Sequence, residues 1–213
     1  TARDSQFVHD LHDAHGHDPQ VAAWLSIVHH ADATAGSTPP EAAVEHLASD
    51  LVSRPHVIPS LVVGQRLAPD ASLLRLLRRA LNRATPDLLH SPHGQMLCEA
   101  MAELAMLAED NADALRWAHR GLRIQPYSAK LALILSQVED DLAVGPPARH
   151  VLAEVARKHP QYVDVTAALI RRENRDGQTD RARLRLSHWL ERQPDHPIAT
   201  ALIRPRRGPR RTE

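Results

Sequence analysis

The sequence predicts an all-α protein, a solenoid of antiparallel helix pairs, and three observations carry this prediction. Apolar residues recur at helical spacing along most of the chain, whereas the alternation typical of strands is missing. Aromatic residues are scarce, with three Trp, two Tyr and one Phe among 213 residues, which favours close-packed helices over a β-sandwich. Two residue types then recur at 34-residue steps: the prolines Pro126, Pro160 and Pro194 and the alanines Ala114, Ala148 and Ala182. A period of this length is typical of a helical repeat that stacks on its neighbours.

Residues 1–18 form a polar segment rich in His and Asp, and a helical region is predicted from 19 to 94. Its first helix begins at Pro19 behind the N-cap residue Asp18, because a proline at the first helical position loses no hydrogen bond. A second helix follows a capping box at 38–41, in which a hydroxyl and a carboxylate satisfy free amides, and it ends before Pro55. We interpret this region as divergent repeats or a separate helical cap.

Two more helices are predicted before residue 95. One runs over 55–67, with Pro59 in its first turn. The next is capped by Asp70 and carries arginines on its outer face, namely Arg75, Arg78, Arg79 and Arg83. Residues 85–94 are predicted to be a linker, because they contain Pro86, Pro92 and Gly94.

Residues 95–203 are predicted to form three helix pairs and a partial capping helix. The predicted ranges are 95–109 with 112–124, 128–141 with 147–158, 162–174 with 179–192, and 197–203 for the cap. The three recurring alanines lie where the two helices of a pair touch, since only a small side chain lets the backbones approach. Each recurring proline ends the second helix of its pair and directs the chain into the next pair.

This pattern resembles the tetratricopeptide repeat (TPR) family over residues 95–196. Gly177 stands at the glycine position of the family, but the usual Trp and Tyr positions hold Cys98 and Ala105 in the first pair. In the second pair they hold Ala132 and Glu139, so the motif is degenerate. The resemblance implies a right-handed superhelical solenoid. The alternative is a helical bundle whose prolines share a spacing by chance.

The resemblance also implies a partner-binding site on the concave face formed by the first helix of each pair. It assigns to this face Glu99, Glu103, Lys130, Leu133, Gln137, Asp164, Ala167 and Arg171. One subgroup of the family grips a carboxylate there, but Glu99 and Glu103 would repel one. The sequence therefore predicts a non-enzymatic scaffold that binds a mixed-charge protein or peptide. The resemblance implies that it works either alone or within a larger bacterial assembly.

A metal-binding protein is the alternative function. His9, His12, His15 and His17 lie among aspartates in the N-terminal segment, and imidazole with carboxylate suits Zn, Ni or Cu. The spacing matches no established metal motif, so a solvated polar segment is the preferred interpretation. No cofactor is predicted, because no phosphate-binding loop or nucleophile elbow is present. Cys98 lies on an apolar helix stripe and is predicted to be buried.

Charge and the chain ends limit the remaining partners. The chain has 26 basic and 26 acidic residues, so no global charge attracts nucleic acid or membrane. The tail 204–213 is rich in Arg and Pro, and it lacks the aromatics needed for specific RNA recognition. We interpret it as a solubilising tail, with binding to phosphate or an anionic lipid surface as the alternative. The short cap at 197–203 would permit end-to-end self-association. No transmembrane segment is predicted, and the compartment stays open between the bacterial cytoplasm and periplasm.

Overall fold

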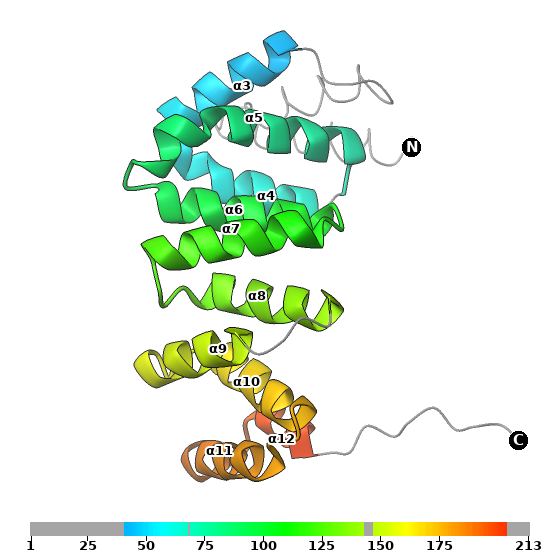
Figure 1. The fold of residues 1–213 in the computed structure, drawn as a ribbon, viewed down its shortest axis with the longest axis vertical. Helices are drawn as coiled ribbons and strands as arrows, with labels where there is room; N and C mark the ends of the chain where they lie inside the picture. Colours follow the sequence, from blue (N-terminus) through cyan, green and yellow to red (C-terminus); the bar gives the residue numbers. More distant parts are fainter. Residues whose placement is uncertain (1–40, 68, 143–146, 204–213) are drawn as a thin grey trace, which may run out of the picture. The chain divides into compact units, whose positions relative to one another are not determined.

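The computed structural model describes residues 41–67, 69–142 and 147–203, and the regular elements in these ranges are all helices (Figure 1). The predicted all-α class is therefore confirmed for this part of the chain. The chain divides into two units at the turn after the first predicted helix pair: an N-terminal unit, Thr1–Ile124, and a C-terminal unit, Gln125–Glu213. The helix expected from Pro19, the polar segment 1–18 and the tail 204–213 lie outside the described residues.

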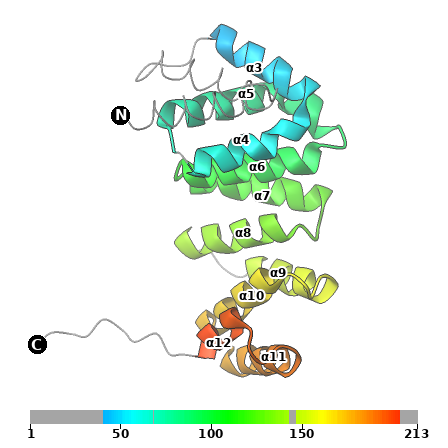
Figure 2. The ribbon, with the colours of Figure 1, turned by 180° about the vertical axis from the view of Figure 1, so that it is seen from behind.

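The N-terminal unit is organised around a central buried helix, α6. Its described elements are α3 Glu41–Ser53, the 3-10 helix η1 Pro55–Val57, α4 Ile58–Leu67, α5 Ala71–Leu89, α6 Gly94–Leu107 and α7 Asn111–Ile124. Helix α6 contacts α4, α5 and α7, while α3 packs on α5 (Figure 2). Because helices cover α6 on three sides, Leu97, Met101 and Leu104 are all fully buried.

The helix boundaries predicted at Pro55 and Asp70 are confirmed, whereas the capping box predicted at 38–41 begins outside the described residues. Helix α3 ends at Ser53, before Pro55 as expected. The predicted 55–67 helix is divided into η1 and α4, with Pro59 in the first turn of α4. Asp70 caps α5, since its Oδ1 accepts a hydrogen bond from the Leu73 N–H at 2.6 Å.

The predicted linker at 85–94 is wrong in its first half. Helix α5 continues through Pro86 and ends at Leu89. Pro86 removes one backbone donor, but it lies only one turn before the helix end, and Leu88 beyond it is buried in the core. Because the helix continues past Pro86, we infer that burying Leu88 stabilises it by more than the missing hydrogen bond costs. The connection to α6 is the short turn 90–93.

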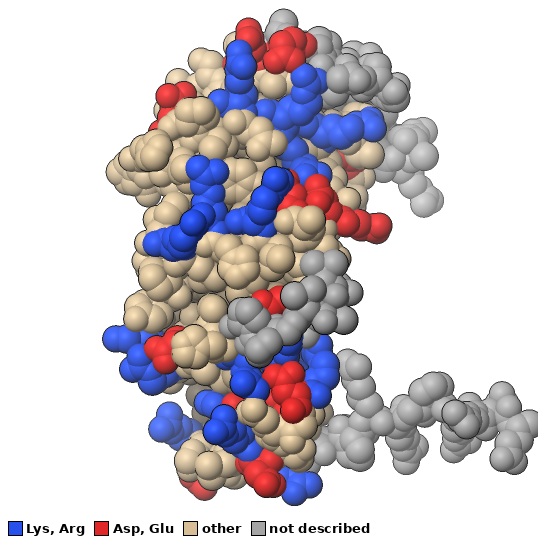
Figure 3. Space-filling model, viewed as in Figure 1, with Lys and Arg blue, Asp and Glu red and all other residues tan. Residues whose placement is uncertain are grey.

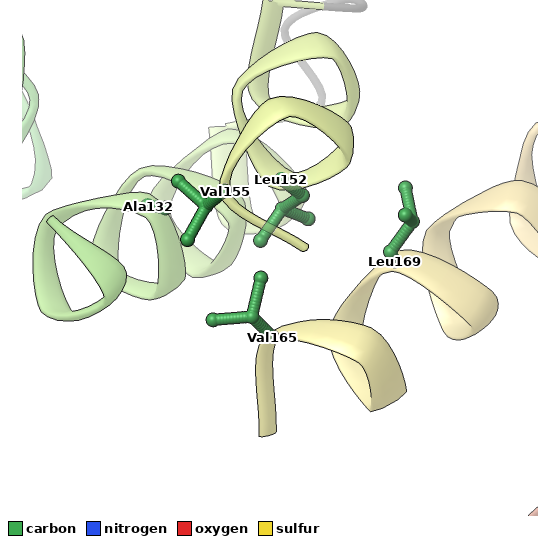
Figure 4. Packing of buried hydrophobic residues seen from close by; sticks show 5 residues of the cluster. All are labelled: Ala132, Leu152, Val155, Val165 and Leu169. Atoms are coloured by element: carbon green, nitrogen blue, oxygen red, sulfur yellow. The ribbon is translucent and has the colours of Figure 1, made fainter. Parts of the chain in front are cut away.

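The C-terminal unit has α10 at its centre. Its described helices are α8 Ala129–Leu142, α9 Pro147–Lys158, α10 Val163–Arg175, α11 Thr179–Arg192 and α12 Pro197–Ile203. Helix α10 contacts the other four and lies between α9 and α11 in both ribbon views (Figures 1 and 2). Figure 4 shows Leu152 and Val155 of α9 above Val165 and Leu169 of α10, with Ala132 of α8 beside them. This cluster fixes α9 on α10.

The predicted 34-residue period is confirmed in the helix ends and in the turns that contain the prolines. Helices α7, α9 and α11 end at equivalent residues, and α8, α10 and α12 begin at equivalent residues. In each proline turn the N–H of the fourth residue donates to the carbonyl of the first. These bonds are Ser128 N to Gln125 O at 3.2 Å, Tyr162 N to His159 O at 3.0 Å and His196 N to Gln193 O at 3.3 Å. Each proline is the second residue of its turn, which is the position that proline favours in β-turns.

The turns inside the helix pairs repeat as well. Gly177 has a φ of 75°, as the glycine position of the family implies, and Glu109, two periods earlier, has a φ of 57°. The N–H of Asp110 donates to Ala105 O at 2.9 Å, and the N–H of Gln178 donates to Glu173 O at 2.8 Å. This is the Schellman arrangement of a helix end, in which the left-handed residue is usually glycine.

Replacing Glu109 by glycine is expected to stabilise the N-terminal unit by roughly 0.5–1 kcal/mol, because the left-handed conformation costs an L-residue more than it costs glycine. Chemical denaturation monitored by circular dichroism measures the change. The matched control is Ala108→Gly, one residue earlier at φ −87°, which is expected to destabilise. Equal shifts for both variants would contradict the strain that we assign to Glu109.

Candidate binding groove of the C-terminal unit

The predicted concave-face residues of the N-terminal unit lie on α6 and are only partly accessible. The Glu103 side chain is 12% exposed, and Nη1 of Arg66 on α4 lies 3.4 Å from its Oε1. Glu99 is half-buried and accepts a hydrogen bond from Gln95 Nε2 at 2.8 Å. Helix α4 therefore packs against the face of α6 that was expected to be open.

The predicted residues of the C-terminal unit are more accessible. Lys130 and Gln137 on α8 are exposed, as are Asp164 and Arg171 on α10. The two apolar residues assigned to this face, Leu133 and Ala167, pack in the core and are less accessible to a partner. Leu133 packs against the cluster in Figure 4, and Ala167 is 1% exposed within the second core cluster, beside Ile170 and Trp189. The binding role of this first-helix face stays a prediction.

A groove that the sequence did not predict lies between the second helices of the C-terminal unit. Its volume is 870 Å³, with α9 as one wall, α11 as the other and part of α10 as its floor. The wall from α9 carries Arg149, His150, Ala153 and Ala156. The wall from α11 is one helix face, with residues at three- and four-residue steps: Arg181, Leu184, Arg185, His188, Trp189 and Arg192.

The lining of the groove is basic. It contains four arginines and a single carboxylate, Glu173. The Glu173 side chain is 4% exposed and accepts two hydrogen bonds from Arg185, at 3.2 Å from Nε and 2.9 Å from Nη2. This geometry is the bidentate pairing that arginine makes with carboxylates, so the one acid of the groove is already neutralised. In Figure 3 basic and acidic side chains lie together over α9 and α11.

Two of the four arginines are held in place by acids and two are not. Arg149 Nη1 lies 3.3 Å from Asp176 Oδ2, and Arg185 is bound to Glu173. Arg181 donates to the amide oxygen of Gln178 at 3.3 Å. Among the residues that the structure describes, neither Arg181 nor Arg192 forms an ion pair. These two guanidinium groups are therefore the charges left for a ligand.

A buried ionic network fixes the α9 wall. Glu139 of α8 accepts a hydrogen bond from the backbone N–H of Ala148, in the first turn of α9, at 2.9 Å. Arg172 Nη1 lies 3.9 Å from Glu139 Oε2, and Arg172 Nε donates to Asp176 Oδ1 at 3.1 Å. Because Asp176 also holds Arg149, the network connects the interior of the unit with the rim of the groove. The resemblance to the TPR family assigned Glu139 to a Tyr position, and the structure places its carboxylate in this network.

Of the four arginines predicted on the outer face of α5, three are paired with acids, and Arg75 donates a hydrogen bond to Ser72 Oγ. Arg79 pairs with Glu41 and Arg83 with Glu45, both on α3. Arg78 Nη2 lies 2.7 Å from both Asp110 Oδ2 and Asp113 Oδ2. The hydrogen bond from Arg78 lowers the pKa of the Asp110 carboxyl below its usual value. These side chains therefore join helices within the N-terminal unit.

Within the described ranges, no group of three or more His, Cys, Asp or Glu residues is placed to hold a metal ion. The four candidate histidines His9, His12, His15 and His17 lie outside these ranges, so the metal alternative stays a prediction.

Cys98 is fully buried, and burial raises the pKa of its thiol to about 11. This placement bears out the predicted role as a small core side chain. No helix in the described part of the chain is long and apolar enough to cross a membrane.

Comparison of the chain with models of known protein families, with curated proteins and with solved structures gives no match. The resemblance to the TPR family therefore depends on the 34-residue period and the turn geometry.

Proposed function

We propose that this protein is a non-enzymatic scaffold that binds a segment of another protein in the groove between α9 and α11. The observation that carries the proposal is the groove itself, because it combines volume, unpaired cations and an exposed apolar side chain, Leu184, on one helix face. A volume of 870 Å³ is in the range of about 300–1,000 Å³ that is usual for ligand sites.

We also propose that the helix pairs between residues 95 and 203 form a TPR-like solenoid. The equivalent helix ends and the repeated proline turns support this proposal. In such arrays the repeats supply surface for partners and rarely carry chemistry, which agrees with a scaffold. The first-helix face with Lys130, Gln137, Asp164 and Arg171 is the competing binding surface.

Site-specific photo-crosslinking distinguishes the two surfaces. The cross-linking amino acid p-benzoyl-phenylalanine replaces His188 in the groove, Gln137 on the first-helix face, or Leu67 of α4 as an exposed control in the other unit. We expect a discrete protein adduct at 188 in cells of the source organism, and none at 137 or 67. An adduct at 137 alone would support the first-helix face, and adducts at neither 188 nor 137 would contradict both surfaces.

A further inference from the structure

We infer that the groove takes a short, extended acidic segment of a protein, with one apolar side chain between two acidic residues. This inference rests on the proposed function and specifies the chemistry of the partner.

The charge of the partner follows from the two unpaired arginines. Arg181 and Arg192 lie eleven residues apart on α11, which places their Cα atoms about 16 Å apart along the helix axis. With both side chains extended away from the helix axis, this separation is too large for one carboxylate or one phosphate group to bridge. A ligand that satisfies both arginines therefore carries two separated negative charges, about five residues apart in an extended chain.

The apolar residue of the partner follows from Leu184. Its side chain is 59% exposed although it lines the groove, and the α9 wall includes the small side chains of Ala153 and Ala156 beside Arg149 and His150. Small residues on one side and an exposed leucine on the other leave space for an apolar side chain to be inserted. Covering Leu184 in this way would remove apolar surface from water, which gives the favourable contact at the centre of a binding site.

The position of Leu184 makes the expected segment asymmetric. Leu184 is three residues from Arg181 and eight from Arg192, or about 4.5 Å and 12 Å along the helix axis. In an extended chain the apolar residue would then stand about one to two residues from one acid and about three to four from the other.

The lining favours a peptide over a nucleic acid. Single-stranded nucleic acids bind to aromatic side chains on which their bases stack. The only aromatic ring other than histidine in the lining, Trp189, is 8% exposed and packs on His196 with ring centroids 5.0 Å apart. Its indole N–H donates to Gln193 Oε1 at 3.3 Å. Trp189 therefore belongs to the core and offers no face for stacking.

The test selects peptides from a random 12-residue display library on the full chain and then measures one selected peptide by fluorescence anisotropy. We expect the selected sequences to share two acids about five residues apart around one apolar residue. The groove variant Arg181→Glu/Arg192→Glu is expected to weaken binding by at least about tenfold, because two attractive charges become repulsive. The control Arg123→Glu/Arg183→Glu makes the same charge change at exposed arginines outside the groove and is expected to stay within about twofold.

A second pair of variants tests the apolar contact. Leu184→Ser is expected to weaken binding by about fivefold or more, whereas Leu67→Ser, at a leucine that is 77% exposed on α4, leaves it unchanged. Thermal unfolding of every variant verifies that the helices are intact.

Several results would overturn the inference: no selected peptide, selected peptides without acids, equal losses in groove and control variants, or tighter groove-dependent binding of a 20-nucleotide single-stranded RNA. The proposed function fails separately, when cross-linking at position 188 captures no protein. A captured partner that binds the charge-reversed groove equally well would leave the function standing and contradict the acidic segment.

Discussion

Replacing Arg172 by methionine is expected to destabilise the C-terminal unit by about 3–5 kcal/mol, the cost of removing one partner from a buried ionic pair. The Arg172 and Glu139 side chains are 8% and 3% exposed, so water cannot replace the guanidinium group. The carboxylates of Glu139 and Asp176 would lose a shared cation inside the unit. Since Asp176 also orients Arg149, the groove rim would loosen as well.

Urea denaturation monitored by circular dichroism measures the effect, with Arg171→Met as the matched control. Arg171 is the preceding residue, is exposed and loses the same charge, so its replacement is expected to change stability by less than about 0.5 kcal/mol. The triple variant Glu139→Gln/Arg172→Met/Asp176→Asn is expected to recover part of the loss, because it leaves neither carboxylate without its shared cation. Similar losses for Arg171→Met and Arg172→Met would show that the network contributes little.

Local signals in the sequence predicted the helices of residues 95–203 well. Proline turns and small residues act within a few positions along the chain, and the ranges 147–158, 179–192 and 197–203 were predicted with the bounds that the structure has. The prediction failed where a distant contact decides the outcome. Pro86 indicates a helix end, but the buried Leu88 extends α5 by one turn. The residues near Pro86 in the sequence do not indicate that Leu88 will be buried in the core.

The candidate site was harder to predict, for the same reason. The family resemblance assigned binding to the first helices, and it contained no information that α4 would pack over Glu103. The groove depends on how α9 and α11 are held apart by α10, which is a property of packing in three dimensions. One signal was present in the sequence: Arg181, Leu184 and Arg192 fall on one helix face that no apolar stripe explains. That this face forms a groove together with α9 could not be inferred from the residues of α11 alone.

Replacing Leu169 by alanine is expected to destabilise the C-terminal unit by about 2–5 kcal/mol, the usual range for a buried leucine whose removal leaves a cavity. Leu169 is fully buried among Ala132, Leu152, Val155 and Val165, as Figure 4 shows. These residues come from α8, α9 and α10, so neighbouring side chains on three helices would have to move to fill the space. If they fill it only partly, the remaining cavity makes the loss of stability larger than the transfer free energy of the removed atoms alone.

Leu184→Ala provides the control, because Leu184 is 59% exposed and its loss is expected to change stability by less than about 0.5 kcal/mol. The two leucines thus have opposite expected roles: Leu169 holds α9 on α10, and Leu184 offers surface to a partner. Denaturation curves and peptide anisotropy, measured on both variants, test this separation. We expect Leu169→Ala to lower the free energy of unfolding, and to weaken peptide binding only if the cavity displaces a groove wall. Leu184→Ala is expected to weaken peptide binding at unchanged stability. Equal stability losses would place Leu184 in the core and remove the apolar contact from the groove.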